Sequence, residues 1–340
     1  MKSDPTASLS KLEFALLNRF QRDFPLLVRP FAALADTLGT DEATVIEHMR
    51  RLQQDGLISR IGAVFRPHAI GASALAALPV PDERLDEVAR LITAFPEVNH
   101  NYEREHRFNV WFVVTASSSG RLQAVLQEIE GTCRCGPVLV LPMLAQYHID
   151  LGFDLLSPAG HGAPAMPAAA SARSNTLSLS GAEQALVAAL QDGLPLVERP
   201  FACLGLPEAQ AIGTVTHWLA QGVIKRFGVV VRHHELGYTS NAMVVWDIPD
   251  ALADEIGQRI AATGRVTLCY RRPRRLPDWH YNLFCMIHGK DRTDVETRIA
   301  TLRDTCGLGA YPHNVLFSRR RFKQRGAYYA PAPATETAHG

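Results

Sequence analysis

The chain has 340 residues, of which 47% are hydrophobic and 20% charged, a composition typical of a globular protein long enough to form two domains. Its formal net charge of +1 argues against a protein whose main role is to coat nucleic acid non-specifically. Of its 35 basic residues five are Lys and 30 are Arg, the side chain that binds carboxylates through paired hydrogen bonds, although a GC-rich genome would produce the same bias.

Neither a membrane span nor a disulfide framework is indicated. The chain contains no run of 18 apolar residues, and its first residues lack the apolar segment of a signal peptide. The six cysteines, at positions 133, 135, 203, 269, 285 and 306, form no C-x-x-C pair. We therefore expect reduced thiols in a cytoplasmic protein that is not attached to a membrane.

The two halves of the chain repeat each other. The motif from Pro25 to Phe31 returns at 195–201, and the sixteen residues 56–71 return at 222–237 with eight identities. Between the halves, 15 of the 20 residues at 157–176 are Ser, Pro, Ala or Gly. This pattern predicts a tandem duplication joined by a flexible linker.

Each half begins with a helix-turn-helix pattern. In the first half, apolar residues at helical spacing predict helices over 10–21 and 31–38, followed by a third helix that begins with Thr40 as its N-cap and ends at Gly56. Two short strands, at 57–61 and 63–66, are then expected to form a wing.

A β-α-β-β-α-β order follows in each half and predicts a ferredoxin-like domain. The expected strands are 74–80, 98–102, 108–115, 138–148, 242–248, 266–271, 281–288 and 313–317, and the expected helices are 83–94, 121–129, 251–263 and 293–305. The predicted fold class is therefore α+β. Helix-turn-helix domains are expected at 10–67 and 178–233, ferredoxin-like domains at 72–155 and 238–330, and the linker at 156–177.

This domain order resembles the Lrp/AsnC transcription regulators, in which the third helix would enter the major groove of DNA. In the first copy that helix carries His48, Arg50 and Arg51 together with four acidic residues, and the second copy, at 208–221, has no Lys or Arg. A helix without cations lacks the phosphate contacts that dominate affinity for DNA. We therefore expect specific DNA binding to be absent and both helices to serve packing.

Polar and aromatic side chains gather instead on the central strands of the ferredoxin-like domains. Residues of a strand alternate between its two faces, so His100, Tyr102 and Arg104 share one face, as do Tyr270 and Arg272 in the second copy. A face that was only buried would carry Val, Ile and Leu. Nearby side chains of the same polar or aromatic kind are Asn109, Trp111, Arg271, Arg275, Trp279, Asn282 and His288. The two tryptophans could equally be core residues.

Four stretches of these strands carry a family resemblance: HNYEREHRFNVW at 100–111, CYRRPR at 269–274, WHYNLFCMIHG at 279–289 and LFSRRRFKQRGAYY at 316–329. They resemble siroheme decarboxylases, Lrp-like proteins of the haem d1 and alternative haem pathways that usually consist of two related subunits. The chain looks like a fusion of both subunits, at about 10–155 and 178–330. His280 departs from the pattern, in which Pro follows the Trp.

The resemblance implies an enzyme that removes two acetate carboxyl groups of siroheme to give 12,18-didecarboxysiroheme in haem d1 biosynthesis, as a step of denitrification. We expect catalytic roles for His100, Tyr102, Tyr270 and Arg272, and substrate binding by Arg104, Asn109, Trp111, Arg271, Arg275, Trp279, Asn282 and His288. No cofactor and no metal held by the protein itself are expected, because the iron belongs to the substrate. His100 and His288 are candidates for its axial ligand.

The expected partners are siroheme, its decarboxylated product, the other half of the chain and other enzymes of the haem d1 pathway. Because Leu268 occupies the position of His100 in the second copy, the two halves are expected to form unequal clefts. Two other classes of function stay open: a transcription regulator of the Lrp/AsnC type, and a haem-binding sensor without catalysis.

Overall fold

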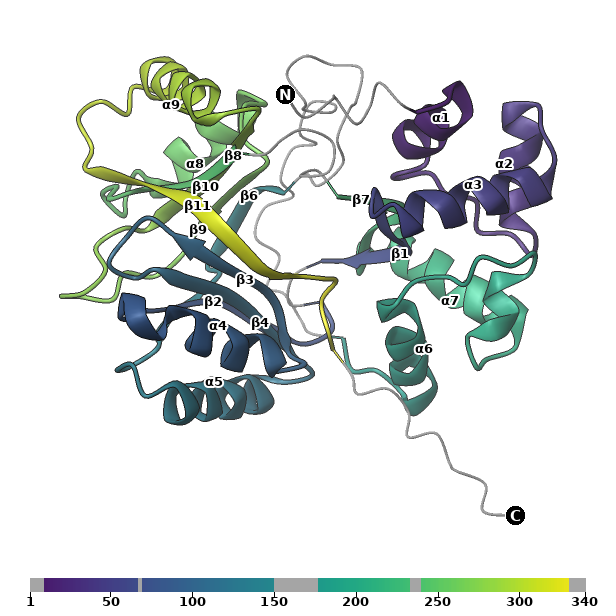
Figure 1. Cartoon of the computed structure of the whole chain (residues 1–340), viewed down its shortest axis with the longest axis horizontal. Coiled ribbons are helices and arrows are strands. Elements are labelled where there is room, and N and C mark those ends of the chain that lie inside the picture. The colour runs from purple at the N-terminus through teal and green to yellow at the C-terminus, as the bar shows by residue number, and fades with distance from the viewer. Residues whose placement is uncertain (1–8, 67–68, 150–176, 233–239, 330–340) are drawn as a thin grey trace.

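The structure is a computed structural model that describes residues 9–66, 69–149, 177–232 and 240–329. It has two lobes, a helical lobe and a sheet lobe, each of which contains parts of both halves of the chain (Figure 1). The predicted linker at 156–177 lies outside the described residues except for its last residue.

The helical lobe joins the two helix-turn-helix units around one hydrophobic core. Buried Leu16, Met49 and Trp218, from both units, belong to this core. The N-cap of α3 is Asp41 and not the predicted Thr40, because the Asp41 carboxylate accepts a hydrogen bond from the backbone N–H of Thr44 at 2.8 Å. The helices are α1 (Lys11–Arg19), α2 (Pro30–Leu38), α3 (Glu42–Gln54), α6 (Gly181–Gln191), the 3₁₀ helix η3 (Pro200–Cys203) and α7 (Glu208–Ala220).

The predicted wing is wrong. Residues 57–66 form one strand, β1 (Ile58–Phe65), which pairs antiparallel with its counterpart from the other half, β7 (Ile224–Val231). Gly62 and Gly228 lie opposite each other in this ribbon, and a Cβ atom on Gly228 would lie 2.4 Å from the carbonyl oxygen of Phe20. The ribbon therefore joins the two helix-turn-helix units through a close backbone contact that only glycine permits.

The sheet lobe contains the predicted β-α-β-β-α-β order twice, in one sheet with the strand order β5-β2-β4-β3-β11-β8-β10-β9-β6. All four helices lie on the outside of the sheet: α4 and α5 on one side of the lobe, and α8 and α9 on the opposite side (Figure 1). The first-half elements are β2 (Ala72–Leu78), η2 (Asp82–Arg84), α4 (Leu85–Ala94), β3 (Val98–Arg104), β4 (Val110–Ala116), α5 (Ser119–Cys133), β5 (Leu139–Pro142) and β6 (Ala145–Ile149). The second-half elements are β8 (Ser240–Trp246), α8 (Ala253–Ala262), β9 (Leu268–Arg271), β10 (Leu283–Gly289), α9 (Arg292–Cys306) and β11 (His313–Gln324).

The last strand of each half crosses to the other half. The segment 138–148, predicted as one strand, is two: β5 pairs with β2 of its own half, and β6 pairs with β9 of the second half. Likewise β11 does not end at Phe317: its first part pairs with β8, and 318–324 pair with β3 of the first half. In Figure 1 the yellow arrow of β11 runs past β3 toward the helical lobe.

Because β5 and β6, at the two ends of the strand order, follow each other in the chain, the sheet turns round on itself and encloses an interior. That interior is a hydrophobic cluster to which both halves contribute, including Leu75, Trp111, Leu141, Val245 and Phe284. Two further cores lie between the outer sheet faces and their helices. Several of the side chains predicted to form the site face this interior.

Candidate active site

On β3, alternation divides the side chains as predicted. Asn101 faces outward, where its amide nitrogen donates to the Ala89 carbonyl of α4 at 3.1 Å. His100, Tyr102 and Arg104 lie on the other face: the His100 and Tyr102 rings stack with centroids 6.3 Å apart, and the Arg104 guanidinium carbon lies 5.7 Å from the Tyr102 centroid. The three residues therefore form one continuous group on the interior face of the sheet.

The second half repeats the Tyr–Arg part of this group. The Arg272 guanidinium carbon lies 4.4 Å from the centroid of the Tyr270 ring, and Tyr270 stacks on Phe284 at 5.8 Å. Each arginine also donates to a backbone carbonyl: Arg104 to Leu316 of the neighbouring strand β11 at 2.9 Å, and Arg272 to Leu141 of β5. The duplication has thus produced two equivalent Tyr–Arg pairs in one interior.

Both guanidinium groups are buried without a carboxylate partner among the described residues. Arg104 is 7% exposed and Arg272 is 9% exposed. Besides the Leu316 carbonyl and the Tyr102 ring, Arg104 contacts the Met286 sulfur, at 3.8 Å. The Nε atom of Arg272 has no hydrogen-bond partner in the described part of the chain. Burial lowers the pKa of Arg104 to about 10 and also lowers the pKa of Arg272. A cation in such surroundings is costly unless an anion joins it.

The ionisable neighbours of Arg104 are held in their neutral forms. Burial lowers the pKa of His100 to about 4, so the imidazole is uncharged at neutral pH. Burial also raises the pKa of Tyr102, although the nearby positive charge of Arg104 partly opposes this shift, so the phenol keeps its proton. The first-half group therefore combines a neutral imidazole, a protonated phenol and a guanidinium.

His288, the other predicted iron-ligand candidate, lies on the interior face of β10, in line with Phe284 and Met286. Its Nδ1 atom is 3.1 Å from the hydroxyl oxygen of Thr267, the residue that precedes Leu268. The second half thus has an imidazole close to the position where Leu268 replaces His100, supplied by the neighbouring strand.

The two predicted tryptophans lie together at the interior. Trp279 and Trp111 are 1% and 2% exposed, and their ring centroids are 5.2 Å apart. The indole N–H of Trp111 donates to the Phe108 carbonyl at 2.7 Å, whereas that of Trp279 is buried with no partner among the described residues. Trp279 also contacts Tyr281, at 5.1 Å, so both tryptophans pack as core residues that border the Tyr–Arg pairs.

Two predicted residues serve the backbone. The amide of Asn109 accepts from the Val80 N–H at 2.9 Å and donates to the Val80 carbonyl at 2.8 Å. Asn282 makes the same pair of bonds to Ile248, at 3.0 and 2.8 Å. Both asparagines hold the chain as it leaves the first sheet-lobe strand of each half, β2 or β8, which explains why the two copies share them.

Two predicted arginines lie apart from the interior group. Arg271 faces outward, where it pairs with Asp250 at 3.2 Å and Asp254 at 3.4 Å. Arg275 lies on the loop that connects β9 to β10, and its Nε atom donates to the Val140 carbonyl of β5 at 3.0 Å. Neither contacts the Tyr–Arg pairs.

The polar partners of the two imidazoles, Asn99 and Thr267, were not predicted. Alternation assigns Asn99 to the face opposite His100, but the register of β3 against β4 shifts between Val98 and His100, and the Asn99 side-chain oxygen lies 3.3 Å from His100 Nδ1. A local irregularity of this kind leaves no periodic signal in the sequence.

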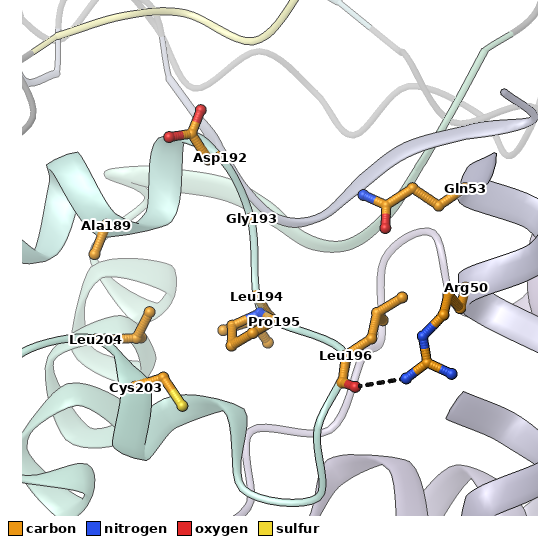
Figure 2. Close-up of a pocket in the computed structure, with 10 residues that line it drawn as sticks. All are labelled: Arg50, Gln53, Ala189, Asp192, Gly193, Leu194, Pro195, Leu196, Cys203 and Leu204. Carbon is orange, nitrogen blue, oxygen red and sulfur yellow. Dashed lines mark hydrogen bonds between the residues drawn. The ribbon is translucent and has the colours of Figure 1, made fainter. Parts of the chain in front are cut away.

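A surface hollow of about 620 Å³ lies elsewhere, in the helical lobe between α3 and 189–204 (Figure 2). Figure 2 shows Arg50 donating to the Leu196 carbonyl, a contact of 3.3 Å between the two halves. The hollow contains none of the predicted site residues. The contact shows that Arg50, a cation of the third helix of the first half, is held by the second helix-turn-helix unit.

Two other kinds of site are absent from the described part of the chain. Within 9–66, 69–149, 177–232 and 240–329, no group of three or more His, Cys, Asp or Glu side chains is arranged to hold a metal ion. In the same residues, no helix has the length and apolarity needed to cross a bilayer.

Comparisons with known proteins agree with this architecture. A family model described as an AsnC-like ligand binding domain matches residues 69–148 and 235–323, and one described as a siroheme decarboxylase NirDL-like HTH domain matches 13–58 and 183–225. The chain is 44% identical over 332 residues to the siroheme decarboxylase NirDL subunit of Paracoccus denitrificans (strain Pd 1222), covering 96% of this chain and 100% of that protein. It is 49% identical over 147 residues to the NirD subunit of Pseudomonas aeruginosa, covering 43% of this chain and 97% of that subunit.

Two solved structures are also similar. The crystal structure of the siroheme decarboxylase NirDL matches with a TM-score of 0.67 and 30% identity, over 93% of this chain and 94% of that one. A crystal structure of NirDL in co-complex with an iron-uroporphyrin III analogue matches with a TM-score of 0.67 and 29% identity, over 93% of each chain. This chain therefore belongs to the siroheme decarboxylase family, with both related units in one polypeptide.

Proposed function

We propose that this protein, a siroheme decarboxylase, converts siroheme to 12,18-didecarboxysiroheme at the interior of its sheet lobe. The observation that carries this proposal is the pair of buried guanidinium groups, Arg104 and Arg272, which have no carboxylate partner among the described residues. Siroheme carries eight carboxylates, so its binding would supply the missing anions. The co-complex of the related NirDL with an iron-uroporphyrin III analogue supports a macrocycle of this class as ligand.

The guanidinium groups of Arg104 and Arg272 would orient the substrate. Each planar fork can take a carboxylate through two parallel hydrogen bonds, and the stacked tyrosine holds the fork in place. Trp111 and Trp279 would cover apolar ring surface at the border of the same interior. Asn109, Asn282, Arg271 and Arg275 act through the fold, since their described contacts are to backbone groups or to acids outside the interior.

Each decarboxylation breaks the bond between the acetate methylene carbon and its carboxyl carbon. The electron pair passes into the conjugated macrocycle as CO₂ leaves, and a new C–H bond then forms at the methylene carbon. One proton is consumed for each CO₂ released, and no electrons are gained or lost overall. The enzyme must therefore deliver a proton twice and needs no external redox partner.

Tyr102 is the better proton donor of the first-half group. Its phenol stays protonated because burial raises its pKa, whereas the neutral imidazole of His100 accepts rather than donates. After each transfer, His100 would take up a proton at its basic nitrogen and pass it to the Tyr102 phenolate, or it would bind the iron of the substrate. In the second half, Tyr270 and His288 would take the corresponding roles, so the two groups of side chains would differ in detail and be similar in chemical content.

Specific DNA binding is not part of this proposal. Arg50 donates to the Leu196 carbonyl of the other half, and the first acid of each third helix, Glu42 or Glu208, is paired with an arginine. The six free thiols suit a reducing cytoplasm, where other haem d1 pathway enzymes would supply the substrate and take the product.

Anaerobic incubation with siroheme, followed by mass analysis, tests the proposal. We expect the loss of two CO₂ with a singly decarboxylated intermediate. A haem-binding sensor would bind siroheme and return it unchanged, and that result would refute the proposed reaction. Arg259→Met, on the outer helix α8, is the matched control for arginine substitutions in the interior, because Arg259 contacts Glu255 and the Cys306 carbonyl outside that interior.

A further inference from the structure

The hydrogen bonds of Thr267 determine which nitrogen of His288 carries a proton. The Thr267 hydroxyl donates to the Met286 carbonyl at 3.1 Å. A hydroxyl has one proton, so only its lone pairs remain for His288 Nδ1, which lies 3.1 Å away. Both contacts are satisfied only when Nδ1 is protonated and donates to Thr267. The lone pair of the neutral ring is then on Nε2.

Asn99 has the same effect on His100 by a different chemical route. Its amide nitrogen donates to the Thr115 hydroxyl at 3.0 Å, which leaves the amide oxygen facing His100 Nδ1 at 3.3 Å. With the amide in this orientation its oxygen can only accept, so His100 Nδ1 carries the proton. Asn99 and Thr115 are 4% and 2% exposed, so water does not readily replace either partner.

The two arrangements occupy the same place in the duplicated fold. Asn99 and Thr267 directly precede the matched positions His100 and Leu268, and each hydrogen-bonds across to the next strand, at Thr115 or His288. The copies have therefore kept a polar bridge between the second and third strands although its members differ. In both copies this bridge contacts Nδ1 of the imidazole.

We propose that Asn99 and Thr267 are positioning residues that hold His100 and His288 in the tautomer protonated on Nδ1, with the basic lone pair on Nε2. This inference deepens the proposed function and rests on it for its consequence: Nε2 is the atom that would take up the proton passed to the neighbouring phenolate, or bind the substrate iron. The tautomer itself is a property of the substrate-free protein. It can be measured without any assumption about the reaction.

The test is ¹⁵N NMR of the substrate-free protein labelled at histidine, which distinguishes a protonated ring nitrogen from an unprotonated one. The resonances of His100 and His288, among the 13 histidines, are assigned by their loss in His100→Gln and His288→Gln. We expect protonated Nδ1 and unprotonated Nε2 in both rings of the unmodified protein. A protonated Nε2 with unprotonated Nδ1 in either ring would overturn the proposal for that ring, with no variant required.

Matched variants test the cause. Thr267→Val removes the hydroxyl at constant shape and should move the His288 proton toward Nε2, whereas Thr267→Ser should preserve the original pattern. Asn99→Leu should likewise release His100, whereas Asn99→Asp, which keeps an acceptor oxygen, should not. As a control, Asn101→Leu on the outer face of β3 should leave the His100 pattern unchanged. Unchanged patterns in Thr267→Val and Asn99→Leu would refute the positioning role.

Turnover of siroheme provides the second readout. We expect Asn99→Leu and Thr267→Val to lower kcat by about 10–100-fold, the usual cost of losing the group that orients a working histidine, with recovery in Asn99→Asp and Thr267→Ser. A changed tautomer with undiminished turnover would refute the functional part of the inference. Absence of CO₂ loss in the unmodified protein would instead refute the proposed function and leave the NMR result standing.

Discussion

Replacing Arg104 by Met should make the free protein more stable and less able to bind its substrate. Methionine keeps the length and apolar stem of the side chain but removes a charge that is buried without an acid partner among the described residues. Burial lowers the pKa of Arg104 from 12.5 to about 10, which corresponds to about 3 kcal/mol of unfavourable free energy for the charged form. The lost hydrogen bond to the Leu316 carbonyl offsets about 1 kcal/mol of that gain. The expected net change is an increase of about 2 kcal/mol in the free energy of unfolding.

The same substitution should weaken siroheme binding by about 10–100-fold, because a charge-assisted hydrogen bond to a carboxylate contributes about 1.5–3 kcal/mol. Denaturant unfolding of the substrate-free protein measures the first effect, and spectroscopic titration with siroheme measures the second. Arg259→Met removes an exposed ion pair and one hydrogen bond to the Cys306 carbonyl, so it should lower the free energy of unfolding by about 1 kcal/mol and leave affinity unchanged. If Arg104→Met destabilises the protein and binds siroheme normally, Arg104 is a structural residue and the reasoning is refuted.

Three further outcomes are expected. Arg272→Lys should weaken siroheme binding by about 1–3 kcal/mol although the charge is kept, because the two-pronged contact is lost; an unchanged dissociation constant would exclude Arg272 from the carboxylate contacts. Protease cleavage at a site introduced within 160–174 should leave the halves associated and active, since β6 and β11 each pair with the other half; separation on a sizing column would contradict this. As the pH falls from 7 to 4, the free energy of unfolding of the unmodified protein should drop by about 3 kcal/mol more than that of His100→Gln. The reason is that burial lowers the pKa of His100 from 6.5 to about 4, so the unfolded chain is protonated first. Denaturant unfolding measures this difference, and equal pH profiles would show that His100 is not buried as a neutral ring.

Local sequence patterns predicted the helices and strands of this fold, but they did not predict how strands of the two halves pair with each other. Helical spacing and strand alternation identified the helix-turn-helix units, the repeated β-α-β-β-α-β order and the shared face of His100, Tyr102 and Arg104. The pairing of β1 with β7 was missed, because a short strand beside a helix-turn-helix unit has the same local signal whether it forms a wing or meets its counterpart.

For the candidate site too, the sequence predicted which residues share a strand face but not what each face contacts. Alternation brought the Tyr–Arg pairs together but says nothing about which face meets a helix, so Arg271 was grouped with them although it pairs with Asp250 and Asp254 outside. The roles of Asn109 and Asn282 depend on loops that fold back onto them, which spacing along a strand does not reveal.

The exchange of strands between the halves also determines when the sheet can be completed during synthesis. β11 follows every other strand of the sheet along the chain, and its second part covers the edge of β3, the strand that carries His100 and Tyr102. While a ribosome makes the second half, the first half therefore carries an unpaired strand edge, a surface prone to pairing with other chains. Only when 318–324 emerge is that edge closed, so the strand that carries His100 and Tyr102 gains its last neighbour at the end of synthesis.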